Sequence, residues 1–380
     1  MSTTVSATDP TALRARLDRA REAAGTAGVD AMLMAPGSDL RYLLGGSGTS
    51  FERLTCLVLP TAAAGRAPVL VVPKLEAPGY AAVPTGELGV EIATWVDDED
   101  PYALVASLVG GASRVALGDV MPALHVLALR RALPAADQVL AGPIVRELRM
   151  RKDAAEVDAL RRAGAAIDRV HARMAEFVRV GRTEAEAGAD IAAAIVEEGH
   201  STADFVIVGS GPNGASPHHD LSGRVLEAGD VVVVDIGGPV PEGYCSDSTR
   251  TYVLGEPRDA DVADTYAVLQ AAQQAAVDAV RPGVAAQDVD AAARRVIADA
   301  GFGEYFIHRT GHGIGLDVHE DPYIVSGNRL ALEPGMAFSV EPGIYQPGRW
   351  GARIEDIVVV TEDGVEALNR RPHELTVLPA

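Results

Sequence analysis

Cysteine is almost missing from this 380-residue sequence, in which Cys56 and Cys245 are the only two. Two thiols cannot build the disulfide framework that holds small secreted domains together, and their scarcity is consistent with a reducing compartment. The opening residues, MSTTVSATDP, have neither the basic nor the apolar segment of a secretory leader, and no later stretch contains about 18 consecutive apolar residues. We therefore expect a cytoplasmic protein that does not enter a membrane.

Positive charge is also scarce: 33 Lys and Arg stand against 53 Asp and Glu, for a formal net charge of −20. Nucleic acids and anionic membranes are bound through basic side chains that neutralise phosphate charge, so we exclude both as partners. An acidic surface that keeps the protein dispersed explains most of the excess. Carboxylates gathered around a metal ion would explain the rest.

Length and composition predict a folded protein of two domains. The chain exceeds the size at which one core usually stops growing, and its hydrophobic content of 48% is that of an ordinary globular protein. Helical patterns alternate with apolar runs up to about residue 142, which predicts an α/β first domain over 1–142 and a second domain over 143–380. The expected helices of the first domain are 11–28, 101–109 and 121–132, and its expected strands are 29–36, 55–60, 68–73 and 114–118.

The second domain opens with a charged pattern over 145–178 that predicts one long helix joining the two domains. A helix over 183–198 and valine-rich strands follow, and helices near 261–281 and 286–300 then precede another set of strands. The order helix, helix, strands thus occurs twice. This repeat predicts an α+β domain made of two related halves that face each other.

The segment VVVVDIGGPVPEGYCSD is the most informative stretch of the sequence. It is typical of a buried strand ending in Asp235, a Gly/Pro-rich turn, and a second strand that reaches Asp247. If the turn centres on Pro241, the two carboxylates face each other across a hairpin, with their Cβ atoms about 4.5–5.5 Å apart. Two anions that close, at the end of a four-valine strand, need a cation or a shared proton.

The same construction recurs in FSVEPGIYQPGRWGARIED, where Glu341 ends one strand and Glu355 lies on the return strand. The midpoint of this pair is Gly348, inside the loop. Strand alternation puts Arg353 on the same side as Glu355, where its guanidinium can orient that carboxylate. A bulge in either loop would shift the pairing by one residue and send one carboxylate to the wrong face.

His312 has a glycine on each side, in TGHGIG, which lets the backbone come close to whatever the imidazole holds. His308 lies four residues earlier, but the residues between them lack the glutamate of the helical zinc motif HExxH, so we reject that kind of site. Each acidic pair alone would more often cap a turn or pair with a surface arginine, and a lone histidine is more often structural. Four carboxylates and one imidazole together predict a two-metal centre.

The segments TGHGIGLDVHE, FSVEPGIY, ARIED and DIGG…YCSDSTRTY together closely resemble the creatinase/aminopeptidase family, and within it the prolidases and aminopeptidases P. The resemblance covers essentially the whole chain and includes the loop GSGPNGASPHH at 209–219. It implies an α/β N-terminal creatinase/prolidase-like domain before a C-terminal pita-bread domain with pseudo-twofold halves. The implied activity is hydrolysis of the bond before proline in dipeptides or short peptides, by a dipeptidase or an aminopeptidase that forms a homodimer.

Carried over residue by residue, the resemblance implies a complete set of ligands for two divalent ions. Asp235 would chelate one ion, Asp247 and Glu355 would bridge both ions, and His312 and Glu341 would complete the second. The spacing between the two aspartates is one residue longer than in many relatives, which leaves the register of the hairpin open. Mostly oxygen ligands with a single nitrogen favour Mn²⁺, with Co²⁺ or Zn²⁺ as alternatives.

The resemblance also suggests catalytic residues around these ligands. His218 and His319 would contact the substrate, and Arg353 would support the metal ligands. A hydroxide bridging the two ions would attack the carbonyl that one ion polarises. Glu341 would relay the proton to the departing nitrogen while the two histidines steady the tetrahedral intermediate. By itself His319 could equally be a solvated turn residue, and His219 is interpreted as a mere neighbour of His218.

Two other functions stay open. A creatinase-like amidinohydrolase on the same fold would work without metal, and the full set of five ligands argues against it. A non-catalytic binding protein on a pita-bread scaffold would typically have lost ligands and gained extensions or basic tails, and the sequence shows neither feature. Methionine aminopeptidase is disfavoured because it needs no N-terminal domain of this size.

Overall fold

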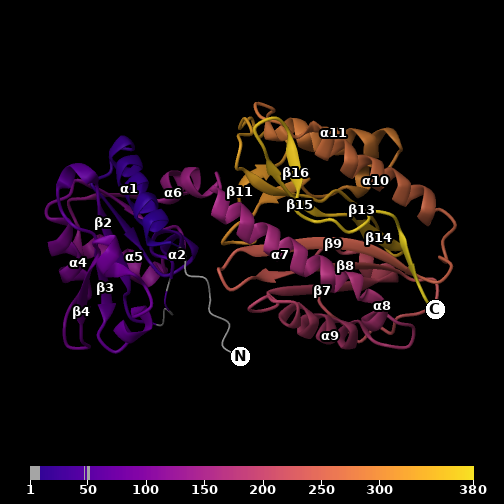
Figure 1. Cartoon of the computed structure of the whole chain (residues 1–380), viewed down its shortest axis with the longest axis horizontal. Coiled ribbons are helices and arrows are strands. Elements are labelled where there is room, and N and C mark those ends of the chain that lie inside the picture. Colours follow the sequence, from indigo (N-terminus) through magenta and orange to yellow (C-terminus); the bar gives the residue numbers. More distant parts are fainter. Residues whose placement is uncertain (1–8, 47, 49–51) are drawn as a thin grey trace. The chain divides into compact units, whose positions relative to one another are not determined.

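The computed structural model describes residues 9–46, 48 and 52–380; the opening residues 1–8, on which the expectation of no secretory leader partly depends, lie outside that description. The chain divides into two compact units, residues 1–149 and 150–380 (Figure 1). The predicted domain boundary after residue 142 lies at the start of the last helix of the first unit and stays a prediction. In the described part of the chain, no helix combines the length and the apolar character that crossing a membrane requires.

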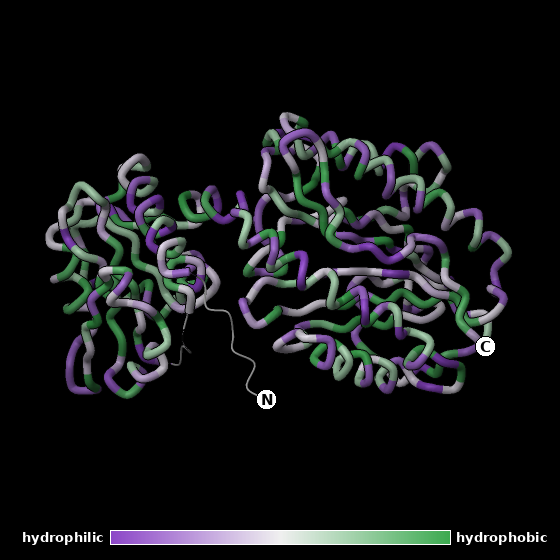
Figure 2. The backbone as a smooth tube through the Cα atoms, in the orientation of Figure 1, coloured by the Kyte–Doolittle hydropathy of each residue, from purple (hydrophilic) through white to green (hydrophobic). Residues whose placement is uncertain are grey.

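A six-stranded sheet with the order β4-β3-β2-β1-β5-β6 forms the centre of the first unit. β1 and β2 consist entirely of buried residues, as their unbroken apolar runs predict. Figure 2 shows hydrophobic stretches running through the middle of this unit. β4 and β6 escape the sequence analysis because they are mostly exposed edge strands and carry no apolar run. The predicted alternation of helices and strands is confirmed.

The elements of the first unit are these. The strands are β1 (Ala31–Met34), β2 (Cys56–Pro60), β3 (Val69–Pro73), β4 (Glu91–Trp95), β5 (Arg114–Leu117) and β6 (Asp137–Leu140). The helices are α1 (Pro10–Thr26), α2 (Ser38–Leu44), α3 (Thr85–Leu88), α4 (Pro101–Val109), α5 (Ala123–Ala132) and α6 (Gly142–Arg149), with short 3-10 turns at Ala62–Ala64 and Ala77–Tyr80.

The single helix predicted over 145–178 is wrong, because the chain forms three helices there. After α6, a new helix begins at a capping box in which Asp153 accepts from the Glu156 backbone N–H and Glu156 accepts from that of Asp153. Between the two helices, Arg151 forms an isolated β-bridge with Met336, which takes this segment out of the helical conformation. The charge pattern continues across the break, so it gives no sign of it.

The second unit contains three sheets, with the orders β17-β9-β8-β7, β11-β10-β12-β15-β16 and β13-β14. Helices back the two larger sheets on their outer faces (Figure 1). Ile167 of α7 and Ile191 of α9 share a core with Val234 of β8, whereas Leu269 of α10 shares a separate core with Phe338 of β12. The two halves predicted from the helix, helix, strand repeat are therefore present.

The elements of the second unit are these. Its helices are α7 (Ala154–Ala172), α8 (Met174–Phe177), α9 (Glu184–Glu197), α10 (Val262–Ala279) and α11 (Ala286–Asp299), with 3-10 turns at Gly211–Ala215 and Gly303–Tyr305. Its strands are β7 (Phe205–Ser210), β8 (Val231–Pro239), β9 (Cys245–Leu254), β10 (Gly311–Gly313), β11 (Glu320–Ile324), β12 (Ala337–Val340), β13 (Gly343–Gln346), β14 (Trp350–Arg353), β15 (Asp356–Val360), β16 (Val365–Ala367) and β17 (Thr376–Leu378).

Candidate metal centre

The hairpin of β8 and β9 carries the first two acidic residues, but not in the predicted register. Asp247 pairs with Gly237, and Asp235 pairs with Thr249, so the two aspartates are diagonal neighbours and the prediction that they are directly opposed is wrong. The turn is centred one residue beyond Pro241. Because side chains alternate along a strand, both carboxylates still lie on one face of the hairpin.

The turn itself explains the shift. It spans residues 240–244, is closed by a hydrogen bond from the Val240 N–H to the Tyr244 carbonyl, and takes a positive φ of 93° at Gly243. A five-residue loop of this kind absorbs the extra residue that the sequence contains between the two aspartates. On the other face of β8, Val232 and Val234 pack into the helix-backed core, which directs Asp235 toward the interior between the two halves.

The second acidic pair follows the predicted register. Gly343 pairs with Arg353, and Val340 pairs with Asp356, so the pairing is centred on Gly348 as predicted. Glu341 and Glu355 fall between these paired segments, at opposite positions where β12 passes into β13 and β14 passes into β15. Hydrogen bonds from the Glu341 N–H to the Thr310 carbonyl and from the Glu355 N–H to the Thr249 carbonyl fix both backbones.

The two glycines beside His312 serve the packing of β10 between its neighbouring strands. A Cβ atom on Gly311 would lie 1.8 Å from the Ser339 carbonyl oxygen, and one on Gly313 would lie 2.2 Å from the Asp321 carbonyl oxygen. Neither contact is possible, so these positions need glycine. These glycines bring β10 close to β12 and β11. That they also bring the backbone close to what the imidazole holds stays a prediction.

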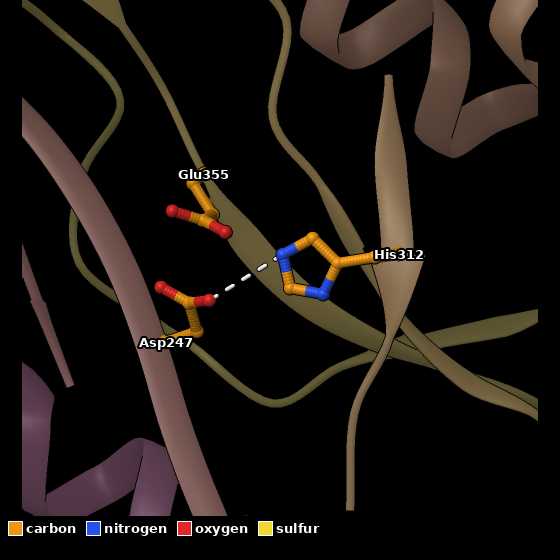
Figure 3. Close-up of side chains that lie close together, drawn as sticks. All are labelled: Asp247, His312 and Glu355. Atoms are coloured by element: carbon orange, nitrogen blue, oxygen red, sulfur yellow. Dashed lines mark ion pairs between the residues drawn. The ribbon is translucent and has the colours of Figure 1, made fainter. Parts of the chain in front are cut away.

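Ligand atoms from Asp247, His312 and Glu355 lie within 4.8 Å of one another, and all three residues are buried (Figure 3). The His312 Nε2 is 3.5 Å from the Asp247 carboxylate and 3.1 Å from that of Glu341. The His312 Nδ1 lies 3.1 Å from the Gly313 carbonyl, which can only accept, so the proton belongs on Nδ1. In a neutral imidazole the Nε2 lone pair then points at two carboxylates, an arrangement that a cation between them satisfies.

The carboxyl groups of this cluster do not ionise independently. Burial raises the pKa of Asp247 well above its ordinary value, and the charges of Asp235 and Glu341 raise it further. Burial, followed by the charge of Asp247, likewise raises the pKa of Glu355. Burial also acts to raise the pKa of Glu341, but its hydrogen bond with His312 and nearby positive charge, including that of Arg353, lower it to about 2. Negative charge is therefore crowded here beyond what the protein alone neutralises.

This donor set fits divalent metal ions. Four carboxylates and one imidazole are hard to intermediate ligands, of the kind that Mn²⁺ and similar ions accept. The Oδ1 atom of Asp235 is buried and has no hydrogen-bond partner among the described residues, so it is an acceptor that a cation would complete.

Arg353 supports Asp235 and not Glu355, which corrects the predicted contact. Its guanidinium lies 2.5 Å from Asp235 Oδ2, and it donates to the Thr249 hydroxyl, the Tyr345 hydroxyl and the Pro217 carbonyl. Thr249 in turn donates to the Glu355 carboxylate at 2.6 Å. Arg353 therefore reaches Glu355 only through a hydroxyl.

Two adjoining cavities surround the cluster. The inner cavity, of about 400 Å³, is lined by all five predicted ligands, and the outer cavity, of about 540 Å³, includes Ile307, His308 and Arg309. His218, His319 and Arg353 line both cavities. Every residue of the predicted site thus lines the inner cavity.

The two predicted histidines enter this space from different segments. His319 packs edge-to-face on His312, with ring centroids 4.1 Å apart. His218 lies in the loop after β7, and its neighbour His219 turns away to contact the Glu184 carboxylate at 2.8 Å. Glu184 is fully buried and also accepts from the Ser210 N–H, so it anchors the loop that presents His218.

The sequence analysis missed three residues that hold side chains of the predicted site in place. The Ser339 hydroxyl accepts a hydrogen bond from the His312 backbone N–H and donates one to the Glu341 carboxylate, and both distances are 3.0 Å. Thr249 and Tyr345 are the other two, and Tyr345 also contacts His308 Nε2 at 2.9 Å. Alternation gave a usable signal for two of them, since Thr249 and Ser339 each stand two residues from a predicted ligand on a strand.

Comparison with known proteins agrees with this geometry. Residues 158–362 match metallopeptidase family M24, and residues 16–151 match the creatinase/prolidase N-terminal domain. A protein of Mycobacterium tuberculosis named probable dipeptidase PepE is 60% identical over 365 residues, which cover 96% of each chain. A Xaa-Pro dipeptidase of Lactobacillus delbrueckii subsp. lactis is 38% identical over 297 residues, covering 76% of this chain and 80% of that protein.

The same agreement holds for a solved structure. The crystal structure of dipeptidase PepE from Mycobacterium ulcerans superposes with a TM-score of 0.93 at 59% identity, covering 98% of this chain and 100% of that one. The chain belongs to metallopeptidase family M24 and carries a creatinase/prolidase N-terminal domain. The expected fold, an α/β domain followed by a pita-bread domain, is confirmed, and so is the expected class of enzyme, a peptidase.

Proposed function

We propose that this chain is an exopeptidase that hydrolyses the bond before proline in dipeptides or short peptides, using two divalent metal ions. The observation that supports the proposal most is the convergence of three buried carboxylates, the partly buried Glu341 carboxylate and the His312 imidazole on one cavity. The relatives named dipeptidase and Xaa-Pro dipeptidase support the substrate class. The two cavities together have the size of known small-molecule sites, about 300–1,000 Å³, and so have room for a dipeptide.

In this proposal each ligand has a distinct place. Asp235 would hold one ion through its unpartnered Oδ1, Asp247 and Glu355 would be shared between the ions, and His312 and Glu341 would complete the second. The oxygen-rich set favours Mn²⁺, and Co²⁺ or Zn²⁺ are the alternatives. The proposal also includes a homodimer, which rests on the family resemblance, and a cytoplasmic location, which fits two unpaired buried cysteines.

When bound, divalent ions supply Lewis acidity toward the substrate carbonyl and make a water molecule nucleophilic near neutral pH. The protein's own residues do the rest. Glu341, whose carboxylate is oriented by the Ser339 hydroxyl, receives a proton from the attacking water and passes it to the departing proline nitrogen. His218 and His319 donate hydrogen bonds to the oxygen on which negative charge develops.

The protonation state of His319 suits this role. Burial, together with the neighbouring His312 and the positive charge of Arg309, lowers the pKa of His319 to about 4. The imidazole is then neutral at pH 7 and keeps one N–H that it can donate to the developing oxyanion. Arg353 acts indirectly, because it fixes Asp235 and the backbone of the loop that carries His218.

The test uses Mn²⁺-loaded protein with three peptides, Ala-Pro, Ala-Pro-Ala and Ala-Ala-Ala, and measures the released amino acids. We expect cleavage before proline and none of Ala-Ala-Ala. Cleavage of the dipeptide alone indicates a dipeptidase, and cleavage of the tripeptide indicates an aminopeptidase. Equal cleavage of all three peptides would contradict the proposed specificity for proline. A purified protein that contains no metal and whose activity is unaffected by a chelator would favour the amidinohydrolase alternative.

His319→Ala should keep the metal and lose rate. Removing one donor to a developing oxyanion typically lowers kcat by about 100- to 1,000-fold, and no ligand atom is removed. The measurement is kcat/KM for Ala-Pro beside the metal content of the purified variant. An unchanged kcat/KM would show that His319 has only a structural role. Loss of metal from the variant would show that His319 is a metal ligand.

A further inference from the structure

Arg250 is a buried arginine of β9 that lines neither of the two cavities. One nitrogen of its guanidinium, Nη1, donates to two backbone carbonyls, that of Thr249 over 2.9 Å and that of Glu355 over 2.7 Å. The Thr249 carbonyl also accepts a hydrogen bond from the Glu355 N–H. These bonds join the strand that carries Asp247 to the segment that carries Glu355, and these two acidic residues are the ones proposed to be shared between the metal ions.

The other nitrogens of Arg250 are also used within the fold. Nη2 lies 2.7 Å from the Asp356 carboxylate and donates to the Arg371 carbonyl over 2.9 Å, and Nε donates to the Pro372 carbonyl over 3.1 Å. A guanidinium has five N–H donors, and the five bonds of this one use them all. The side chains of the ion pair are 4% and 2% exposed. Arg250 therefore holds parts of the protein together and offers no donor to solvent or substrate.

The spacing between the two strands that carry the shared ligands depends on contacts of this kind. In the described part of the chain, β9 belongs to the four-stranded sheet and β15 to the five-stranded sheet, so the register of a common sheet does not set this spacing. The C-terminal segment, residues 369–378, contacts both strands, because β17 pairs with β9 and the His373 Nε2 lies 2.6 Å from the carboxylate of Asp356 on β15. Arg250 lies where these three parts meet.

We propose that Arg250, held in place by Asp356, is a positioning residue that sets the spacing of Asp247 and Glu355 and thereby the affinity of the site for a pair of divalent ions. This inference rests on the proposed two-metal function. Carboxylates repel one another when no cation lies between them, and a link between their backbones opposes their separation. The ions of a two-metal site lie about 3.5–4 Å apart, and its ligands have to be held within about 0.5 Å, so displacing one strand impairs the binding of both ions.

The test compares wild-type protein with Arg250→Lys and with a control, Tyr266→Phe. The Tyr266 hydroxyl donates to the His373 carbonyl over 2.9 Å, so the control loses a hydrogen bond to the same C-terminal segment but keeps every bond of Arg250. Calorimetric titration of metal-free protein with Mn²⁺ should show about 10- to 100-fold weaker binding by Arg250→Lys, as loss of support for metal ligands does. The electron paramagnetic resonance signal of coupled Mn²⁺ pairs should also decrease in this variant. Tyr266→Phe should match the wild type in both measurements.

The melting temperature of metal-free protein separates positioning from stability. Arg250→Met leaves the Asp356 carboxylate buried without its arginine, which should lower the melting temperature by about 10 °C. Arg250→Lys should recover much of this loss, because the carboxylate has a cation again. It should not recover the affinity for Mn²⁺, because one ammonium cannot replace the planar fork that bonds Thr249, Glu355 and Asp356 together.

Two results would overturn the role of Arg250. One is wild-type affinity for Mn²⁺ with an unchanged spectrum in Arg250→Lys, and the other is an equal loss of affinity in Tyr266→Phe, which would mean that any loosening of the C-terminal segment has the same effect. Wild-type protein that binds a pair of Mn²⁺ ions but cleaves no Xaa-Pro peptide would overturn the proposed activity and leave this inference intact. Wild-type protein that binds no divalent ion would overturn both.

Discussion

Asp247→Ala is expected to abolish both metal binding and turnover. Asp247 lies in the cluster with His312 and Glu355, so its loss removes a ligand proposed to be shared by two ions. If the ions contribute several kcal/mol to the transition state, the rate falls by about three orders of magnitude or more. The measurements are metal content after gel filtration and kcat for Ala-Pro.

Stability measurements separate this effect from misfolding. Burial and neighbouring charge already raise the pKa of Asp247, so its removal from metal-free protein relieves crowding and should not lower the melting temperature. The wild type should gain about 2.7 kcal/mol at a metal concentration a hundred times Kd, and the variant should gain none. Asp299→Ala, an exposed position at the end of α11, is the matched control. Wild-type metal content in Asp247→Ala would show that the bridge is assigned wrongly.

Arg353→Met is expected to destabilise the metal-free protein and to weaken the loaded enzyme. The substitution leaves the Asp235 carboxylate in a buried position without its cation, and breaking a buried pair in this way costs about 3–5 kcal/mol. For a unit of this size that corresponds to a fall in melting temperature of about 10 °C. Loss of support for metal ligands should also lower metal affinity or activity by about 10- to 100-fold.

Arg353→Lys is the matched variant, because it keeps the charge and loses the planar fork. It should recover much of the stability of metal-free protein, since the buried carboxylate has a cation again. It should not recover full activity, because one ammonium cannot reach Asp235, Thr249 and Tyr345 together. A Met variant as stable as wild type without metal would mean that Asp235 is not held by this pair.

The acidic ribbons show what strand patterns can and cannot predict. The pairing centred on Gly348 was predictable because the two paired segments, on either side of Glu341 and Glu355, keep the same register. The pairing centred on Pro241 failed because the turn closes between Val240 and Tyr244, a choice set by local hydrogen bonding that alternation does not encode. The register error did not change the face of the hairpin on which each aspartate lies. The two carboxylates come together because they lie on the same face.

Contacts between side chains far apart in the sequence were less predictable. Alternation gave the side on which Arg353 lies, but not that Thr249 would stand between it and Glu355. The role of Glu184 in anchoring the loop of His218 could not be predicted from the sequence. An acidic residue at the start of a helix is common, and the burial of this one depends on the loop that folds over it. The roles given to the ligands themselves stay predictions from resemblance, now supported by their convergence.

The distribution of the ligands between sheets has a mechanical consequence. Asp235 and Asp247 belong to the four-stranded sheet, while His312 belongs to the five-stranded sheet of the other half. An ion held by both Asp247 and His312 would link the two halves to each other. Metal binding and the packing of the two halves against each other would then be coupled in one equilibrium. A substitution that destabilises either half, even far from any ligand, would therefore lower the affinity for the metal ion.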